Sequence, residues 1–197
     1  MLTGARRATI GELDRVVEVL TASHVDYAWE QWALPWDDRS ERLTRLYESD
    51  VGTLAFSSGE VWVTECRRSA AVWLPGDAYA QLGPHERRAL DASSRSAFGE
   101  RISIIDEVEN AVAAQRPPAN WHLATMGTLP DVQRKGLGTA VLQPRLTALD
   151  RAHASAVLET SEPGNLQFYG RLGFEIVAEL AQLPHSAPTT WIMRRST

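Results

Sequence analysis

Residues 129–139 read LPDVQRKGLGT and connect a stretch with strand composition to one with helical spacing. Gly136 and Gly138 let the backbone turn with its N–H groups pointing inward. The helix that follows adds the partial positive charge of its N-terminus, and Arg134 and Lys135 add full charges beside it. We therefore expect this turn to bind a pyrophosphate group.

The residue order in this turn argues against two common phosphate-binding motifs. A Walker A loop places its lysine after the second glycine, whereas Lys135 precedes both glycines here. The dinucleotide fingerprint needs a small residue where this chain has Val141. A plain strand-to-helix connection stays open as an alternative for a turn with only two glycines.

A second informative segment lies downstream, where residues 158–174 read LETSEPGNLQFYGRLGF. Asn165 and Tyr169 are four residues apart, so they share one face of the short helix predicted there. Core packing of the neighbouring rings of Phe168 and Tyr169 is the alternative explanation of that helix. The order of the two segments along the chain favours one site built from both.

Together the two segments resemble the hallmarks of the GNAT N-acetyltransferase superfamily. Gln133, Gly136 and Gly138 match its Q/R-x-x-G-x-G/A loop. Asn165 and Tyr169, followed by a Gly-Phe pair, match its second hallmark in loose form.

The resemblance covers most of the chain, and within that superfamily the chain is most similar to the puromycin N-acetyltransferase branch. Similar segments include residues 121–128 (WHLATMGT), 158–161 (LETS) and 190–194 (TWIMR). Arg134 stands where the loop commonly has glycine, and Gly164 replaces the arginine usual beside the asparagine. The second departure predicts a weakened contact with the cofactor.

The resemblance implies a single GNAT domain over residues 1–197, of the mixed α/β class, with a central twisted mixed sheet of about six to seven strands flanked by helices. Strand–helix–strand units in the second half independently favour parallel or mixed strands. The expected strands are 5–10, 61–63, 70–74, 121–129, 156–160, 174–180 and 189–193. The expected helices are 12–22, 39–47, 84–110 with a break near 98–99, 136–153 with a kink at Pro144, and 163–172.

The resemblance also implies acetyl-CoA as co-substrate. In the family, the asparagine matched by Asn165 bonds the pantetheine arm, and the tyrosine matched by Tyr169 protonates the departing thiolate. Strand N–H groups near a bulge polarise the acetyl carbonyl. The cofactor-binding residues expected on this basis are Met126, Gly127, Thr128, Arg134, Lys135, Gly136, Leu137, Gly138, Thr139 and Asn165.

The residue that deprotonates the amine is left open by the sequence. His122 falls on the strand where several GNAT enzymes place a glutamate, and an imidazole suits proton transfer near neutral pH. Alternatively, the His122 side chain points outward only because side chains alternate along a strand, and it has no catalytic role. Glu159 is a second candidate, with sheet anchoring as its alternative role. An α-amine is partly neutral at pH 7, so removal of its proton by a chain of water molecules is the third alternative.

An aromatic cluster near the N-terminus is the candidate wall for the acceptor. It holds Tyr27, Trp29, Trp32 and Trp36, and such rings give flat apolar surface with a polar tip. We expect Tyr27 and Trp29 to bind substrate, whereas a core corner under a loop is the alternative reading of the cluster.

Composition limits the other partners. The net charge of −5 and pI near 5.6 argue against nucleic acid. No stretch approaches the ~20 apolar residues of a membrane helix, and the start lacks a signal-like apolar run. The five histidines lack metal-ligand spacing. Cys66, the one cysteine, is expected to be buried on a strand.

The expected function is therefore acetyl transfer from acetyl-CoA to a primary amine of a small molecule, in the cytoplasm and without a metal. An aminonucleoside such as puromycin is one candidate acceptor, which would make the enzyme an antibiotic-resistance factor. A protein or peptide N-acetyltransferase and a non-catalytic CoA-binding module are the alternatives. GNAT proteins are often dimers, so a homodimer is also left open.

Overall fold

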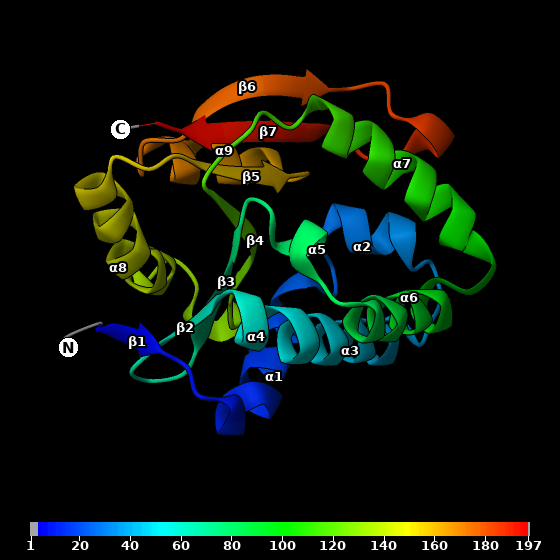
Figure 1. Ribbon diagram of the computed structural model, residues 1–197, viewed down its shortest axis with the longest axis horizontal. Helices are drawn as coiled ribbons and strands as arrows, with labels where there is room; N and C mark the ends of the chain where they lie inside the picture. Colours follow the sequence, from blue (N-terminus) through cyan, green and yellow to red (C-terminus); the bar gives the residue numbers. More distant parts are fainter. Residues whose placement is uncertain (1–3, 197) are drawn as a thin grey trace.

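Seven strands form one mixed sheet in the order β1-β2-β3-β4-β5-β7-β6 (Figure 1). The computed structural model describes residues 4–196. β4 and β5 pair in parallel, and every other neighbouring pair is antiparallel. This confirms the expected class and mixed sheet. The strands are β1 (Ala5–Arg7), β2 (Glu60–Thr64), β3 (Ser69–Pro75), β4 (Trp121–Thr128), β5 (Ala156–Thr160), β6 (Glu175–Leu180) and β7 (Thr190–Arg195).

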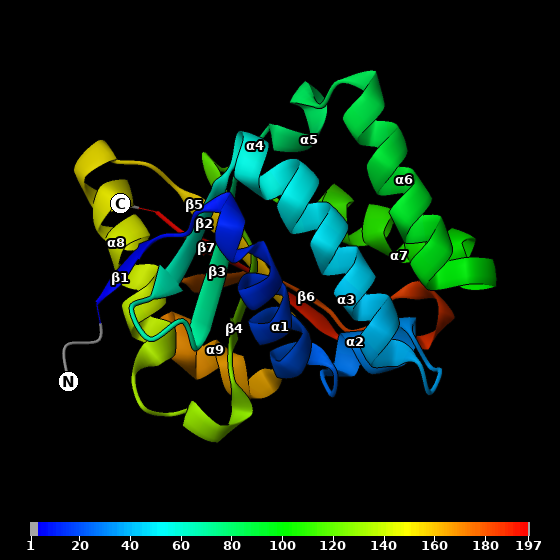
Figure 2. The ribbon, with the colours of Figure 1, turned by 90° about the horizontal axis from the view of Figure 1, so that it is seen from below.

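Helices cover both faces of this sheet (Figures 1 and 2). Apolar residues at helical spacing in α8, among them Leu142, Leu146 and Leu149, pack on one face together with α9. On the other face, α1 packs directly on β3 and β4, and α3 packs against α1. The helices are α1 (Leu13–His24), α2 (Ala28–Ala33), α3 (Arg39–Ser49), α4 (Phe56–Ser58), α5 (Ala78–Gln81), α6 (Pro84–Phe98), α7 (Ile102–Gln115), α8 (Leu137–Ala152) and α9 (Pro163–Gly170).

The parallel strands β4 and β5 separate soon after they start. They pair only at Trp121 with Ala156 and at His122 with Val157. On its other side, β4 pairs Leu123 with Trp73 and then Thr125 with Val72, so Ala124 is the extra residue of a bulge. The bulge turns β4 away from β5 and opens a wedge between the two strands (Figure 1). The backbone groups of β4 that face this wedge lack a strand partner beyond His122 within residues 4–196.

Several local expectations were wrong at element boundaries. The first strand ends at Arg7, because Thr9 and Glu12 form a capping box that starts a 3-10 turn. The aromatic stretch, for which no element was predicted, contains α2. Residues 50–58, which carried no predicted element, form a π-helical turn that leads into α4. Cys66 is exposed in the β2–β3 turn rather than buried on a strand.

α8 continues through Pro144, which lies inside it. None of the helices within residues 4–196 is long and apolar enough to cross a lipid bilayer.

Close packing of α1 on β4 requires glycine at position 127. A Cβ atom there would overlap the Ser23 hydroxyl and lie 2.9 Å from the Ser23 Cβ. We expect Gly127→Ala to lower the free energy of unfolding by about 1–2 kcal/mol through overpacking, measured by urea denaturation. Ser23→Gly in the same chain should restore part of that loss. Additive effects of the two substitutions would contradict this contact.

Candidate active site

The turn between β4 and α8 presents backbone donors at the start of a long helix. Gly136 has a left-handed conformation with φ of 83°, and Arg134 has φ of 61°. The first bond of α8 runs from the Ala140 N–H to the Gly136 carbonyl at 3.0 Å, and no side chain caps the helix. The N–H groups of residues 137–139 therefore have no acceptor in the described part of the chain. Such a helix end favours an anion.

Two cationic side chains stand beside these donors. Arg134 and Lys135 are both exposed. The Lys135 Nζ donates to the carbonyl of Asp131 at 3.2 Å, and the Gln133 Nε2 donates to the carbonyl of Thr128 at 3.2 Å. Gln133 thus holds the turn against the end of β4, while both charges remain open to solvent.

The start of α8 packs against β4 and α9. The Leu137 side chain is buried, whereas Thr139 is exposed. A Cβ atom at Gly138 would make ordinary contacts, 3.4 Å from Phe168 and 3.6 Å from Met126. Three segments that the sequence separates thus meet at the helix N-terminus.

The end of β4 is fixed by its neighbour β3. The Ser69 hydroxyl donates to the Gly127 carbonyl at 2.9 Å and lies 2.9 Å from the Thr128 hydroxyl. The family-based expectation places the acetyl-polarising N–H groups at Met126 to Thr128, and the bulge at Ala124 comes just before them.

Asn165 and Tyr27 meet at the carboxyl end of β5. The Asn165 Nδ2 donates to the Thr160 hydroxyl oxygen at 3.1 Å, and the Tyr27 hydroxyl lies 2.7 Å from the same oxygen. The Ser161 N–H donates to the Tyr27 hydroxyl at 2.7 Å. A cofactor-binding candidate and a substrate-binding candidate therefore share one hydrogen-bond network, although they lie 138 positions apart in the sequence.

Tyr169 is buried between other aromatic rings of the α8–α9 layer. Its ring centroid lies 5.0 Å from that of Phe168 and 6.0 Å from that of Phe174. The hydroxyl makes no hydrogen bond within the described residues. Burial, with a smaller contribution from Tyr27, raises the pKa of Tyr169 far above its ordinary value. The phenol therefore holds its proton at neutral pH, as a proton donor must.

The two candidate bases form one network with an arginine. His122 Nε2 lies 2.6 Å from a Glu159 carboxylate oxygen, and Arg116 Nε donates to the other oxygen at 2.5 Å. Burial alone would raise the pKa of Glu159, but the His122 hydrogen bond and the Arg116 charge outweigh it and lower that pKa. The carboxylate is therefore ionised and can orient the imidazole.

A cavity of about 520 Å³ opens beside this network. Its wall includes His122, Arg116 and Tyr79, together with the β3–α5 connection. Tyr79 is 54% exposed, so this wall of the cavity is open to solvent.

The tryptophans near Tyr27 are held by structural contacts. The rings of Trp29 and Trp32 lie 5.1 Å apart, and both pack on the core beneath α1 and α3. The Trp32 Nε1 donates to the His185 carbonyl at 3.1 Å, and the Arg42 guanidinium lies over Trp36 at 4.5 Å. These contacts fit the core-corner explanation better than an open wall. The role of Trp29 as a substrate contact stays a prediction.

Three carboxyl side chains that no sequence motif marks have raised pKa values. Burial raises the pKa of Glu30 to about 8 and that of Asp50 to about 6. Burial, reinforced by the charges of Asp50 and Asp106, raises the pKa of Glu109 to about 7. None of Glu30, Asp50 and Glu109 has an ion pair within the described residues.

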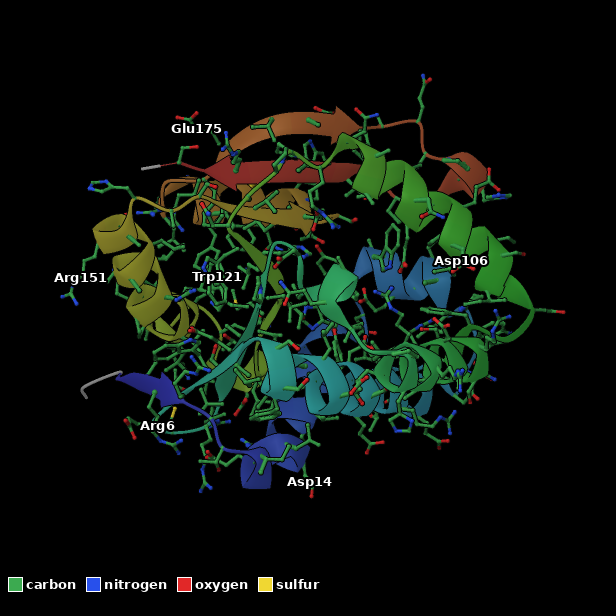
Figure 3. The ribbon with its side chains drawn as sticks, viewed as in Figure 1. Arg6, Asp14, Asp106, Trp121, Arg151 and Glu175 are labelled. Atoms are coloured by element: carbon green, nitrogen blue, oxygen red, sulfur yellow. The ribbon has the colours of Figure 1, made fainter. Side chains whose placement is uncertain are left out.

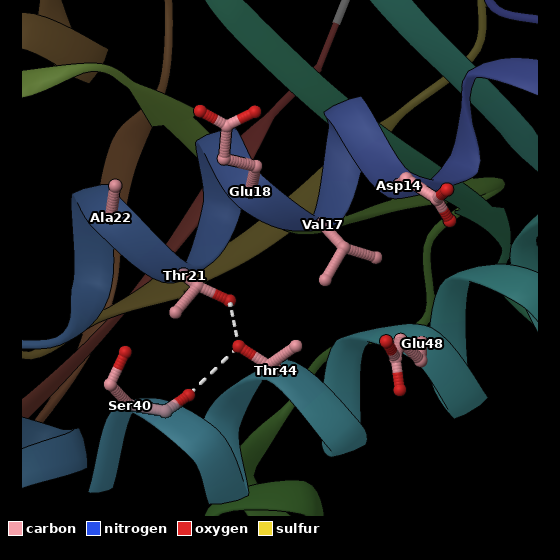
Figure 4. Close-up of a pocket in the computed structure, with 8 residues that line it drawn as sticks. All are labelled: Asp14, Val17, Glu18, Thr21, Ala22, Ser40, Thr44 and Glu48. Carbon is pink, nitrogen blue, oxygen red and sulfur yellow. Dashed lines mark hydrogen bonds between the residues drawn. The ribbon is translucent and has the colours of Figure 1, made fainter.

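A second hollow, of about 370 Å³, lies between α1 and α3 on the outer surface (Figure 4). There the Thr21 and Thr44 hydroxyls lie 3.3 Å apart, and Asp14, Glu18 and Glu48 stand around them. None of the predicted site residues lines it. Within residues 4–196, no group of three or more His, Cys, Asp or Glu side chains is arranged to hold a metal ion.

Comparison with known proteins agrees with this geometry. Residues 99–174 match the model of the acetyltransferase (GNAT) family. That segment contains α7, the wedge strands β4 and β5, the turn before α8, and α9. The family match therefore concerns this segment of the chain, residues 99–174.

Solved structures show the same fold at low identity. A histone acetyltransferase HPA2 and related acetyltransferase from Corynebacterium glutamicum is 20% identical with a TM-score of 0.69, covering 100% of this chain and 97% of that one. A polyamine N-acetyltransferase from Drosophila melanogaster is 17% identical with a TM-score of 0.58, covering 98% and 99%. A mosquito arylalkylamine N-acetyltransferase like 5b is 14% identical with a TM-score of 0.59, covering 98% and 99%.

Proposed function

We propose that this protein is an N-acetyltransferase that moves the acetyl group of acetyl-CoA to a primary amine of a small molecule. The observation that carries the proposal is the set of free N–H donors at residues 137–139 beside the β4–β5 wedge. The donor set suits a diphosphate, and Asn165 is hydrogen-bonded to Thr160 at the end of β5, one of the two strands that border the wedge. The family match over residues 99–174 supports the same chemistry.

Acetyl-CoA, when bound, supplies an acetyl group activated as a thioester. The N–H groups of residues 137–139 with Arg134 and Lys135 would hold its diphosphate, and Asn165 would position the pantetheine arm. N–H groups of β4 in the wedge would stabilise charge on the acetyl oxygen, where one good donor contributes roughly 2.7–4 kcal/mol. The Tyr169 hydroxyl would donate its proton to the departing sulfur.

His122 is the proposed acceptor of the amine proton. Because its Nε2 is bonded to Glu159, its Nδ1 is the nitrogen left for this role. We expect His122→Gln to remove the acidic limb of the pH profile of kcat/KM, since glutamine does not titrate in that range. The measurement is the initial rate of CoA thiol release from pH 5.5 to 9. An unaltered profile would assign the deprotonation to water.

Charge at the turn can be tested by cofactor binding. We expect Arg134→Ala with Lys135→Ala to weaken CoA binding about tenfold at low salt, and less at high salt, because exposed ion pairs are screened. Arg151→Ala is the matched control, since this exposed side chain lies at the far end of the same helix (Figure 3). Equal affinities for both variants, measured by calorimetry, would place the diphosphate elsewhere.

The acceptor is tested with a panel of amines. Puromycin belongs in it, because residues 121–128 and 158–161 resemble that enzyme branch. Polyamines and arylalkylamines belong in it, because the structures named for them share this fold. Release of CoA thiol with small amines but not with peptides supports the proposal. Turnover of peptides alone would favour a protein N-acetyltransferase, and CoA binding without turnover would favour a regulatory module.

A further inference from the structure

The backbone of Arg116 is restricted at the point where α7 ends. Its N–H donates to the Ala113 carbonyl at 3.1 Å, and its φ of −72° and ψ of 120° are extended values. Pro117 follows, and proline disfavours a helical conformation in the residue before it. Pro117 and Pro118 also have fixed φ angles. The Arg116 side chain therefore starts from a defined place beside the sheet.

This side chain contacts a carboxylate that two groups share. The Arg116 Nε donates to one oxygen of Glu159 at 2.5 Å, and the His122 Nε2 lies 2.6 Å from the other oxygen. The side chains of Glu159 and His122 are only 16% and 14% exposed, so water has little access to the carboxylate. Because each oxygen has its own partner, removing the guanidinium would free the carboxylate to rotate.

The charge of Arg116 also bears on the imidazole. A carboxylate by itself favours the protonated imidazolium, which cannot accept a further proton. The guanidinium on the same carboxylate opposes that effect, because it offsets the negative charge. Arg116 and His122 both line the 520 Å³ cavity, so this balance is set at a wall that a small molecule can reach.

Other titratable and charged side chains also face this network. Asp77 and Tyr79 line the same cavity from the side of α5. Arg194 on β7 pairs with Val157 of β5 and therefore lies on the same face of the sheet. The guanidinium charge acts on Glu109 of α7 as well. Since several groups titrate here, a test needs a signal from the imidazole itself beside the reaction rates.

We propose that Arg116 is a positioning residue, which holds the Glu159 carboxylate so that the His122 imidazole keeps its proton on Nε2. That tautomer leaves Nδ1 as the acceptor of the amine proton. A merely structural tie between α7 and β5 would leave the imidazole unchanged when Arg116 is replaced. The inference rests on the proposed function for the use of His122, whereas the tautomer can be observed without turnover.

The first measurement is the nitrogen NMR spectrum of the histidine side chains at pH 8, with His122→Gln assigning the His122 signals. We expect the neutral ring to carry its proton on Nε2 in the unsubstituted protein. Arg116→Gln should increase the share of the Nδ1–H tautomer, whereas Arg116→Lys keeps the charge and should keep most of the Nε2–H form. Arg6→Gln is the matched control, since Arg6 on the edge strand β1 bonds Glu12 at 2.8 Å (Figure 3).

The second measurement is the pH profile of CoA thiol release. Arg116→Gln should lower kcat about tenfold, part of what a positioned base contributes. It should also move the acidic limb of kcat/KM to higher pH, since an unopposed carboxylate favours the imidazolium. Glu159→Gln should move that limb to lower pH, because it removes the negative charge. Acetyl-CoA affinity should change little in both variants, and circular dichroism verifies that each is folded.

Each outcome decides one claim. A His122 tautomer that Arg116→Gln leaves unchanged would overturn the inference, even if the variant loses stability. A change as large in Arg6→Gln would also overturn it, since net charge would then be the cause. If Arg116→Gln does not fold, an unchanged tautomer in Glu159→Gln removes the inference instead. Absence of CoA thiol release with every amine would count against the proposed function and leave the tautomer result standing.

Discussion

Tyr169→Phe should lower kcat by about 10²–10⁴-fold, the range that a positioned general acid contributes. Phenylalanine keeps the ring contacts with Phe168 and Phe174 and removes only the hydroxyl. Because that hydroxyl makes no hydrogen bond within residues 4–196, thermal stability and acetyl-CoA affinity should change little. Single-turnover release of CoA thiol is the measurement, since it reports chemistry rather than product release.

The pH dependence of the rate loss in Tyr169→Phe gives a second test. Burial raises the pKa of Tyr169 beyond the usual assay range, so its deprotonation should not limit the rate below pH 9. Tyr169→Phe should therefore lower the rate by the same factor from pH 6 to pH 9. If the single-turnover rate stays within twofold of the unsubstituted protein, the sulfur takes its proton from water and Tyr169 has only a packing role.

Local sequence signals predicted the cofactor half of the fold well. The glycine turn, the periodic α8 and the apolar β5 carry strong patterns, and each formed as expected. The predicted ends of helices and strands were wrong where tertiary contacts determine them. The Glu12 carboxylate, held by Arg6 at 2.8 Å, ends the first strand early. The π-helical turn after α3 has no compositional mark, because it depends on how residues 51–55 fill the core.

Only some residues of the candidate site could be predicted from the sequence. Motif residues such as Asn165 could be found by spacing, whereas the link between Asn165 and Tyr27 runs through Thr160 and forms only in the folded chain. The bulge at Ala124 shifts side-chain alternation along β4, so His122 and Thr125 share a face that a regular strand would deny them.

Glu30→Gln should stabilise the protein in a pH-dependent way. The folded state raises the pKa of Glu30 from 4.5 to about 8, with burial as the main cause. Between these values the folded state binds the proton more tightly than the unfolded state, so the carboxyl group costs stability as pH rises. The whole shift corresponds to about 5 kcal/mol. Water at the half-buried site screens the charge, so we expect about 2–3 kcal/mol at pH 8.

Urea denaturation of both proteins at pH 5 and pH 8 checks this expectation. The difference in unfolding free energy should be near zero at pH 5 and should favour the glutamine variant at pH 8. Comparing the two proteins cancels other titrating groups such as His24, which is unchanged between them. Glu48→Gln, on the exposed side of α3, should show no such trend. A pH-independent difference would mean that Glu30 is solvated, whereas the expected trend would mean that this fold retains a carboxylate that costs stability.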